Sequence, residues 1–418
     1  METIQLINRI IGLLFFLCLS YQIVYLLLPF IKRDRPHGPA VLHRYAILIA
    51  ARNEETVLPH LLDTLRGQDY PADCFTVFVM ADNCTDRTAQ VARAGGAVVF
   101  ERQNKVRVGK GYALNALLSE IGARYGTDAF DGYMVFDADN LLASDFLSAM
   151  NRTFSDGYRI ITSYRNSKNY GDNWISAGYG LCFLRDSCFL NHPRMLIGSS
   201  CSVAGTGFCF SREVLETAGG WNFFLLTEDT EFTADCILRG ERIGYCGEAM
   251  LWDEQPVRFS QSCRQRMRWV RGYLQVLGKY GGGLVRGIFD RYGFSCFDML
   301  MNTLPLFALG IVGILLQTAA LVAAVITHAP VLPVLRQGIW GAVSSYLSLF
   351  AVGALTTFSQ WSKINTSPQR KLGYLFTFPL FVMTYIPISV AAVLRPVEWK
   401  PIEHKAAVSL EEVKARHH

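Results

Sequence analysis

Two stretches, Phe75-Thr-Val-Phe-Val-Met-Ala-Asp82 and Tyr133-Met-Val-Phe-Asp-Ala-Asp139, decide the fold. Each is a short apolar run that ends in a carboxylate, and such a run predicts a buried strand. Carboxylates at the carboxyl ends of strands in an α/β sheet lie in the crevice where ligands bind. Two further motifs follow downstream, Thr227-Glu-Asp229 and Gln265-Arg-Met-Arg-Trp269. The four motifs in this order indicate an enzyme that handles a nucleotide-activated substrate.

The segment from 43 to 139 alternates apolar runs with helical patterns. This alternation predicts a βαβ, Rossmann-like α/β sheet. The first strand is expected at 45–50, and a helix follows it. Three loops, which hold Glu54, Asp82 and Asp139, are therefore expected to meet at one edge of the sheet.

The beginning of the chain is strongly apolar. Hydrophobic residues make up 51% of the 418 residues, and residues 11–31 carry no charge. About 20 such residues span a bilayer, so this segment predicts a membrane anchor. A cleaved signal peptide is the alternative, but Arg9 alone makes a weak n-region and no small-residue cleavage site follows. Lys32, Arg33 and Arg35 follow directly, which places this end of the anchor in the cytoplasm.

Three more apolar stretches follow in the last third of the chain, at 304–326, 338–358 and 374–394. The anchor leads into the cytoplasm, so the catalytic region is expected to stay there. The first two stretches are then expected to cross the membrane out and back. The third is interrupted by Pro379 and Pro387. A full crossing of this stretch would put the basic tail outside, against the charge rule. We therefore predict that 374–394 lies in the interface or is re-entrant.

The sequence predicts a multi-pass protein of the cell membrane. Its predicted parts are an anchor at 1–35, a cytoplasmic catalytic domain at 40–260, interfacial amphipathic helices at 261–298, two transmembrane helices at 299–358, an interfacial or re-entrant helix at 374–394, and a cytoplasmic tail at 395–418. The eleven cysteines are odd in number and lack a C-x-x-C pair, so they indicate neither a disulfide framework nor a zinc site. The net charge of +5 suits an anionic membrane surface, and no nucleic-acid partner is expected.

The Asp137/Asp139 pair can present oxygen ligands to a hard divalent cation. Such a cation usually keeps waters and binds through one or two carboxylates plus substrate phosphates. Because no histidine adjoins the pair in sequence, Mg²⁺ or Mn²⁺ is expected rather than zinc. A lone D-x-D also occurs in surface turns, and Asp82-Asn83 after a strand equally suits a turn.

The two downstream motifs each allow two interpretations. Thr227-Glu-Asp229 is either a helix N-cap with acids in the first turn or the site of a general base. In the second motif Gln265, Arg268 and Trp269 share one helical face. A Trp platform beside Arg and Gln suits sugar stacking and pyrophosphate neutralisation. The alternative is a basic amphipathic helix on the membrane surface, formed by Arg264, Arg266, Arg268 and Arg271.

Together the four motifs resemble those of the membrane-embedded family 2 glycosyltransferases. That family includes cellulose, hyaluronan, chitin and poly-N-acetylglucosamine synthases and the chitooligosaccharide synthase of nodulation. The likeness covers roughly residues 45 to 273. It implies a GT-A fold, with transmembrane and interfacial α-helices around it. The implied reaction is inverting transfer of a hexosyl or N-acetylhexosaminyl group from a UDP-sugar.

The resemblance also implies roles on the donor side. Asp82 would contact the uracil, and Asn53 and Glu54 would line the uridine pocket. Lys110 would approach the diphosphate or the donor sugar.

The carboxylates of the other motifs take the metal and the proton in the same resemblance. Asp139, helped by Asp137, would hold Mg²⁺ or Mn²⁺. Asp229 would be the base that deprotonates the acceptor hydroxyl. Glu228 is counted with the substrate-binding residues and is the first alternative base.

The remaining implied roles surround the acceptor. Gln265 and Arg268 would hold the diphosphate, and Trp269 would stack beneath the acceptor sugar. Gly205 and Thr206 lie in a glycine-rich loop that is similar to the family's acceptor-proximal loop.

The C-terminal tail is similar to one branch of the family. The stretch from 385 to 405 resembles the interfacial helix and nucleotide-gating loop of cellulose synthases, although the cellulose-type gating sequence is absent. This similarity favours a cytoplasmic tail.

The number of membrane spans departs from that of the polymer-secreting members, because three helices do not easily enclose a polymer channel. The enzyme then makes short chains, glycosylates a lipid, or forms homo-oligomers. The leading hypothesis is elongation of a β-linked poly- or oligosaccharide at the membrane. The second is transfer of one sugar to a membrane lipid. A third, a membrane-tethered nucleotide-binding scaffold with a dead site, is opposed by the presence of Asp139 and Asp229.

Overall fold

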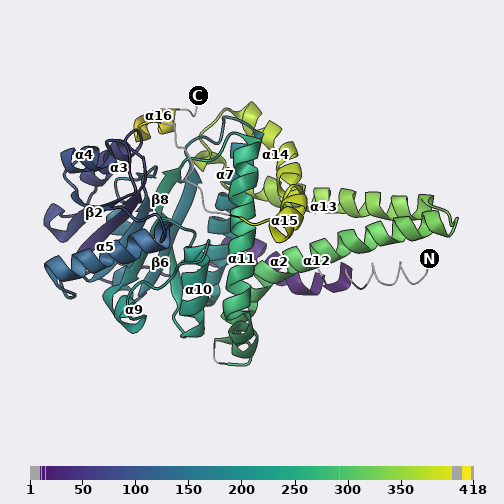
Figure 1. The fold of residues 1–418 in the computed structure, drawn as a ribbon, viewed down its shortest axis with the longest axis horizontal. Helices are drawn as coiled ribbons and strands as arrows, with labels where there is room; N and C mark the ends of the chain where they lie inside the picture. The colour runs from purple at the N-terminus through teal and green to yellow at the C-terminus, as the bar shows by residue number, and fades with distance from the viewer. Residues whose placement is uncertain (1–9, 11, 15, 291, 398–406, 416–418) are drawn as a thin grey trace.

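The computed structural model describes residues 10–415 except 11, 15, 291 and 398–406. At its centre is one eight-stranded sheet (Figure 1). The strand order is β3 (Val98–Arg102), β2 (Phe75–Asp82), β1 (Tyr45–Ala51), β4 (Gly132–Asp137), β7 (Phe208–Ser211), β6 (Ile160–Ser167), β8 (Ile243–Asp253), β5 (Leu141–Leu142). Strands β3, β2, β1 and β4 are parallel neighbours. Strand β7 is antiparallel to both β4 and β6, and β8 runs parallel to β6.

Helices cover both faces of this sheet, which makes a three-layer α/β fold. One face carries α3 (Leu58–Arg66), α4 (Thr88–Ala94) and α6 (Phe146–Ser155). The other face carries α5 (Lys110–Tyr125), α7 (Trp174–Asp186), α9 (Arg212–Thr217) and α10 (Glu228–Leu238). Burial on both faces explains why the parallel strands read as continuous apolar runs. The α/β prediction is confirmed.

Alternate side chains of strand β1 point into the two hydrophobic cores on opposite faces of the sheet. Leu48 packs into the core beneath α5 and α10, and Ile49 packs into the core beneath α3 and α6. In the register of the sheet, Ala51 pairs with Ala81 and Ala50 pairs with Asp137. The ends of β1, β2 and β4 therefore lie at one edge, as the sequence predicts.

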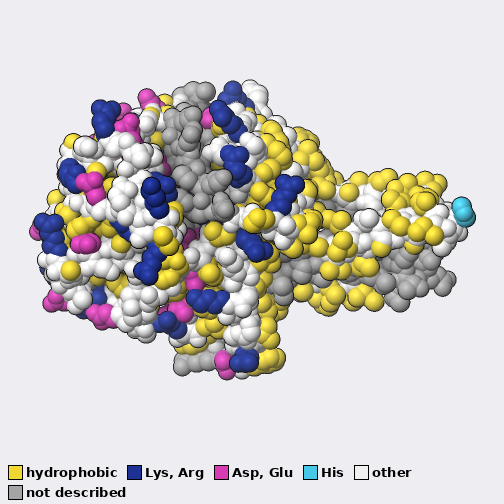
Figure 2. Space-filling model, viewed as in Figure 1, with side chains coloured by type: hydrophobic (Ala, Val, Ile, Leu, Met, Phe, Trp, Pro, Cys, Tyr) yellow, Lys and Arg dark blue, Asp and Glu magenta, His cyan; other side chains and the backbone are white. Residues whose placement is uncertain are grey.

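Beside this body stands α11 (Phe259–Gly287), a single helix of 29 residues (Figure 1). The apolar helices α12 (Gly293–Ile326) and α13 (Leu332–Ser359) form a hairpin that projects from the body, with α2 (Tyr21–Ile31) near its base. In Figure 2 this arm is covered largely by hydrophobic side chains. Within the part of the chain that the structure describes, three helical segments are long and apolar enough to cross a membrane, at Gly12–Ile31, Leu332–Ser359 and Pro368–Leu394. A shorter apolar segment, Ile311–Ile326, lies within α12.

The segment predicted to be interfacial or re-entrant forms two helices, α14 (Pro368–Met383) and α15 (Tyr385–Leu394). Helix α14 packs against α7 and against α13, and α15 packs against α11 (Figure 1). Pro379 lies inside α14, and the two helices meet at Thr384, three residues before Pro387. At this break Arg266 donates from Nη1 to Phe381 O at 3.1 Å and to Thr384 Oγ1 at 2.6 Å. Arg266 is fully buried, so α11 does not present it on a basic surface.

The short helices complete the fold. They are the 3₁₀ turns η1 (Ala72–Cys74) and η3 (Trp361–Lys363), the π-helical turn η2 (Ser187–Asn191), α8 (His192–Ile197) and α16 (Leu410–Ala415). Val413 of α16 packs against Trp252 at the end of β8. The Glu398–Lys405 part of the expected gating loop lies outside the described residues.

Candidate active site

A cavity of about 360 Å³ lies at the carboxyl ends of the strands. The ends of β1, β2, β4 and β8 form its floor, and α5, α10 and α11 contribute their side chains from the rim. Most of the predicted site residues line it: Glu54, Asp82, Lys110, Asp137, Asp139, Gly205, Glu228, Asp229, Gln265, Arg268 and Trp269. Segments that are more than two hundred positions apart in the sequence therefore meet in one cavity.

Two predicted residues lie beside the cavity and do not line it. Asn53 has a left-handed backbone (φ 58°), and its Oδ1 accepts from the N–H of Thr85 at 2.8 Å. The hydroxyl of Thr206 accepts from the N–H of Asp137 at 3.0 Å and donates to Asn140 Oδ1. Both side chains hold the loops that carry site residues, and neither reaches the cavity.

The β2 end of the cavity holds an ion pair. Asp82, which closes β2, accepts from Arg102 Nη1 at 2.5 Å. The two residues are register partners on adjacent parallel strands. Sequence reasoning missed Arg102, because only the strand register brings it to Asp82.

Lys110, the first residue of α5, connects two predicted loops. Its Nζ donates to Asp137 and to the carbonyl of Gly205, the latter at 2.7 Å. Gly205 has a left-handed backbone, and a Cβ there would lie 3.4 Å from Asp229 Oδ2. Glycine at this position therefore keeps the space in front of that carboxylate oxygen open.

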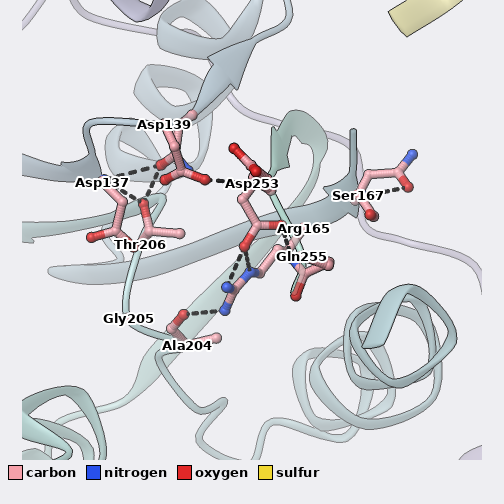
Figure 3. Close-up of polar contacts among 12 residues, drawn as sticks. Asp137, Asp139, Arg165, Ser167, Ala204, Gly205, Thr206, Asp253 and Gln255 are labelled. Atoms are coloured by element: carbon pink, nitrogen blue, oxygen red, sulfur yellow. Dashed lines mark hydrogen bonds and ion pairs between the residues drawn. The ribbon is translucent and has the colours of Figure 1, made fainter. Parts of the chain in front are cut away.

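Figure 3 shows the polar network behind the D-x-D motif. Asp139 is 4% exposed, and its Oδ2 accepts from the N–H of Glu254 at 2.8 Å. Next to it, Asp253 accepts from Arg165 Nε at 2.8 Å, and Arg165 Nη1 donates to Ala204 O at 2.8 Å. Burial raises the pKa of Asp253 to about 6, with a further rise from Asp139 and an opposing effect from Arg165.

Sequence reasoning also missed Arg165 and Asp253, for different reasons. Asp253 ends the apolar run Ala249-Met-Leu-Trp of β8, which is the same signal that singled out Asp82 and Asp137. Arg165 lies within β6 and carries no local signal. Its role depends on the pairing of β6 with β8.

The donor atoms at this edge fit a hard divalent cation. They are carboxylate oxygens of Asp137 and Asp139, which suit Mg²⁺ or Mn²⁺ better than a soft metal. Among the residues that the structure describes, no group of three or more His, Cys, Asp or Glu side chains could hold a metal ion. A cation here would therefore complete its shell with waters and substrate phosphates, as Mg²⁺ commonly does.

Glu228 and Asp229 form the first turn of α10 and face the cavity. Thr227 makes no side-chain cap bond, although Asp229 Oδ1 accepts the N–H of Thr230 at 2.8 Å. Burial raises the pKa of Asp229, while the Thr230 bond, Arg268 and Lys110 oppose the rise. The pKa of Glu228 is raised to about 7, chiefly by burial and then by Asp229. A carboxylate with a raised pKa is suited to general-base work near neutral pH.

Three side chains of α11 close the cavity from the opposite side. Arg268 Nη1 donates to Leu226 O at 2.8 Å. Gln265 Oε1 is buried without a hydrogen-bond partner among the described residues. Buried polar atoms are nearly always paired, so this oxygen marks a place for a donor. Trp269 meets the rings of Tyr179 and Phe183 edge-on, with centroids 5.6 Å and 6.3 Å away.

A comparison with models of protein families shows to which family the chain belongs. The family model described as "Glycosyltransferase like family 2" matches residues 43–272, which is more than half of the sequence. The chain belongs to the family 2 glycosyltransferases. The predictions of a glycosyltransferase of this family and of its α/β fold are confirmed. The matched region contains all four sequence motifs and the first half of α11.

Individual relatives of this family 2 glycosyltransferase are distant. A β-monoglucosyldiacylglycerol synthase of Synechocystis sp. is 26% identical over 381 residues, which cover 86% of this chain and 75% of that protein. A poly-β-1,6-N-acetyl-D-glucosamine synthase of Staphylococcus aureus is 24% identical over 238 residues, 55% of this chain and 54% of that one. The match to the probable glycosyltransferase YdaM of Bacillus subtilis, 26% identical, covers 57% of each chain. The chain thus spans about half the length of the latter two relatives.

A solved structure supports the fold of this family 2 glycosyltransferase. The mannosyltransferase PcManGT from Pyrobaculum calidifontis, in complex with GDP-Man and Mn²⁺, aligns with a TM-score of 0.59 and 18% identity. The alignment covers 92% of this chain and 98% of that one. The likeness extends beyond the catalytic domain and confirms a GT-A-like fold followed by long apolar helices.

Proposed function

We propose that this protein transfers one hexosyl or N-acetylhexosaminyl group from a UDP-sugar, with inversion, to a hydroxyl of a membrane-borne acceptor. A single observation carries the proposal. One cavity contains the D-x-D carboxylates, Asp229, and Met299 and Thr303 in the first turns of α12. The residues proposed to bind the donor, the proposed general base Asp229 and the start of the apolar hairpin therefore line one cavity.

The donor side of the cavity offers fixed cations and polar groups. Arg268 and Lys110 lie within electrostatic reach of Asp229 and Glu228. In this position they can stabilise the negative charge that develops on a departing diphosphate. A divalent cation held at Asp137 and Asp139 would add charge neutralisation of the same leaving group. The choice of uridine as the nucleoside of the donor rests on the resemblance of Asp82 and its surroundings to the family motif.

The chemical step needs one base and no covalent enzyme intermediate. Asp229 Oδ2 faces the space that Gly205 leaves open. There it takes the proton from the acceptor hydroxyl while the acceptor oxygen attacks the anomeric carbon. The bond to the diphosphate breaks on the opposite face of the sugar, so the configuration inverts. Trp269 and Gln265 form the wall against which the acceptor is positioned.

A lipid is the acceptor we favour. The cavity reaches α12, and the α12–α13 hairpin is apolar (Figure 2). The relative with the broadest match of those described above acts on diacylglycerol by its name. In this proposal the hairpin and the N-terminal segment lie in the cell membrane, the catalytic domain is cytoplasmic, and membrane lipids are partners. Elongation of a saccharide is the second candidate, because a poly-β-1,6-N-acetyl-D-glucosamine synthase also matches the catalytic region.

Product analysis separates these candidates. Membranes that contain the protein would be incubated with radiolabelled UDP-glucose, UDP-N-acetylglucosamine, UDP-galactose or UDP-glucuronic acid, with GDP-mannose as the control donor. We expect one labelled product in the organic phase and release of UDP. A ladder of water-soluble products would instead support saccharide elongation. Use of GDP-mannose alone would contradict the uridine assignment.

A further inference from the structure

Part of the cavity wall, here called its second end, is formed by residues that lie outside the four motifs. It is lined by η2 and α8 of the catalytic body and by the first turns of α12. Its lining residues are Asp186, Leu190, Asn191, Arg194, Met299, Asn302 and Thr303. Burial raises the pKa of the Tyr273 hydroxyl, and both Asp229 and Asp186 contribute to the rise. Both carboxylates therefore lie within electrostatic reach of one tyrosine of this cavity.

A π-helical turn shapes this end. Helix α7 ends at Asp186 and continues as the turn η2 before α8 begins. Such turns are rare and are frequent at functional sites. The wider turn places positions i, i+4 and i+5 on one face, and Asp186, Leu190 and Asn191 all line the cavity.

The positive charge of Arg194 at this end is compensated by an ion pair. Arg194 Nε donates to Asp298 Oδ2 at 2.6 Å, and Nη2 donates to Asp298 Oδ1 at 3.0 Å. Both side chains are at most 4% exposed. Asp298 also accepts from the hydroxyls of Tyr21 and Tyr25 of α2. The bidentate pair fastens α2 and α12 to the catalytic body and leaves Arg194 neutralised.

Asp186, in contrast, is partly exposed. Its side chain is 45% exposed. It meets Arg185 Nη1 at 3.2 Å, and Arg185 also donates to Gln22 of α2 at 2.9 Å. Arg185 is not among the residues that line the cavity.

We propose that Asp186 is the acceptor-selecting residue of this enzyme, and that it admits an uncharged hydroxyl-bearing acceptor and disfavours one that carries phosphate. The inference rests on the proposed function, because it assigns this end of the cavity to the acceptor. A carboxylate accepts hydrogen bonds from the hydroxyls of a glycerol or sugar head group. A phosphate would meet this carboxylate and would find the nearby arginine already paired.

The experiment compares a neutral acceptor with an anionic one. Purified enzyme at pH 8 would receive labelled UDP-sugar and either diacylglycerol or phosphatidylglycerol in mixed micelles. Two like charges 4 Å apart cost about 1 kcal/mol even in bulk water, which is roughly fivefold. We expect wild-type kcat/KM to favour the neutral lipid by at least about fivefold. Asp186→Asn should reduce this ratio toward one, with donor KM unchanged, and Asp186→Glu should restore it.

A matched control and a second acceptor pair make the result decisive. Asp63→Asn makes the same change in an exposed surface ion pair and should leave the ratio at the wild-type value. Octyl glucoside and its 6-phosphate form the saccharide pair. If only saccharides accept sugar, the lipid acceptor is wrong, and the ratio within the saccharide pair judges Asp186. A wild-type preference for the anionic member, an unchanged ratio in Asp186→Asn, or no transfer to any neutral acceptor overturns the inference.

Discussion

Arg165 and Asp253 form an ion pair between the neighbouring parallel strands β6 and β8, directly beside Asp139. The side chains are 16% and 4% exposed, and Arg165 also lies over the ring of Phe183, 3.8 Å from its centroid. Through Ala204 O the same guanidinium holds the loop that carries Gly205. One arginine therefore connects the D-x-D edge, the loop in front of Asp229 and the aromatic wall.

Replacement of this arginine should destabilise the fold. In Arg165→Met, Asp253 stays buried and loses its charged partner, although it still accepts from Gln255 Nε2, and such a loss typically costs about 3–5 kcal/mol. Denaturant unfolding in detergent, followed by tryptophan fluorescence, measures the change. Arg66→Met removes an exposed pair with Asp63 and should cost at most about 1 kcal/mol. Equal losses in the two variants would show that the Arg165 pair has no special weight.

Activity should depend on a divalent cation. Removal of the cation with EDTA should abolish transfer, and Mg²⁺ or Mn²⁺ should restore it, because Asp137 and Asp139 supply only part of a coordination shell. Asp139→Asn should weaken UDP binding in the presence of the cation and leave it unchanged without the cation. Isothermal titration of UDP with and without Mn²⁺ tests this. Full activity in chelator would contradict the assignment.

Asp229→Asn should separate catalysis from binding. The amide keeps the size of the side chain and its bond from Thr230 but cannot take a proton. Loss of a general base typically costs about 10²–10⁴ in rate. We expect turnover to fall by that order while UDP-sugar binding and the unfolding midpoint stay at wild-type values. A loss of stability without loss of activity in the folded fraction would support the capping interpretation, and Glu228→Gln would then test Glu228 as the base.

The pH dependence of kcat/KM should reflect the raised pKa of Asp229. The base must be deprotonated to act, so kcat/KM should fall as the pH drops through this pKa. Because burial raises the pKa, the acid limb should lie above the usual value of 3.8 for an aspartate. Arg268 lowers this pKa, so Arg268→Ala should move the limb to higher pH and Arg268→Lys should not. A limb that stays fixed in Arg268→Ala would assign it to another group.

Replacement of Arg268 should impair donor use, whereas replacement of Trp269 should impair transfer to the acceptor. In the proposed function, Arg268→Ala removes a charge-assisted hydrogen bond to the diphosphate, and such a bond is worth about 1.5–3 kcal/mol. A raised donor KM or lost turnover is expected. Trp269→Ala removes the acceptor wall, so transfer should fall while UDP binding is retained, and Trp269→Phe should recover part of it. Wild-type kinetics in both alanine variants would reduce α11 to a membrane-surface helix.

The sequence by itself determined the catalytic edge of the sheet. Asp82 and Asp137 end their strands because the apolar run stops at the residue that leaves the core, and this pattern is local. The i, i+3, i+4 spacing in α11 likewise brought Gln265, Arg268 and Trp269 to one cavity. Family motifs supplied the reaction class, and the family match confirms it.

Tertiary structure decided which charges meet. Arg165 reaches Asp253 across 88 positions of sequence, and Arg194 reaches Asp298 across 104. Arg266, one position after Gln265, is turned away from the cavity and into the break between α14 and α15. Leu190 and Asn191 share the face of Asp186 because of a π-helical turn that no local pattern announced. Local periodicity fixes the face on which a side chain lies, whereas its partner depends on how the faces of distant elements pack, because electrostatic and hydrogen-bond energies depend on distance in space.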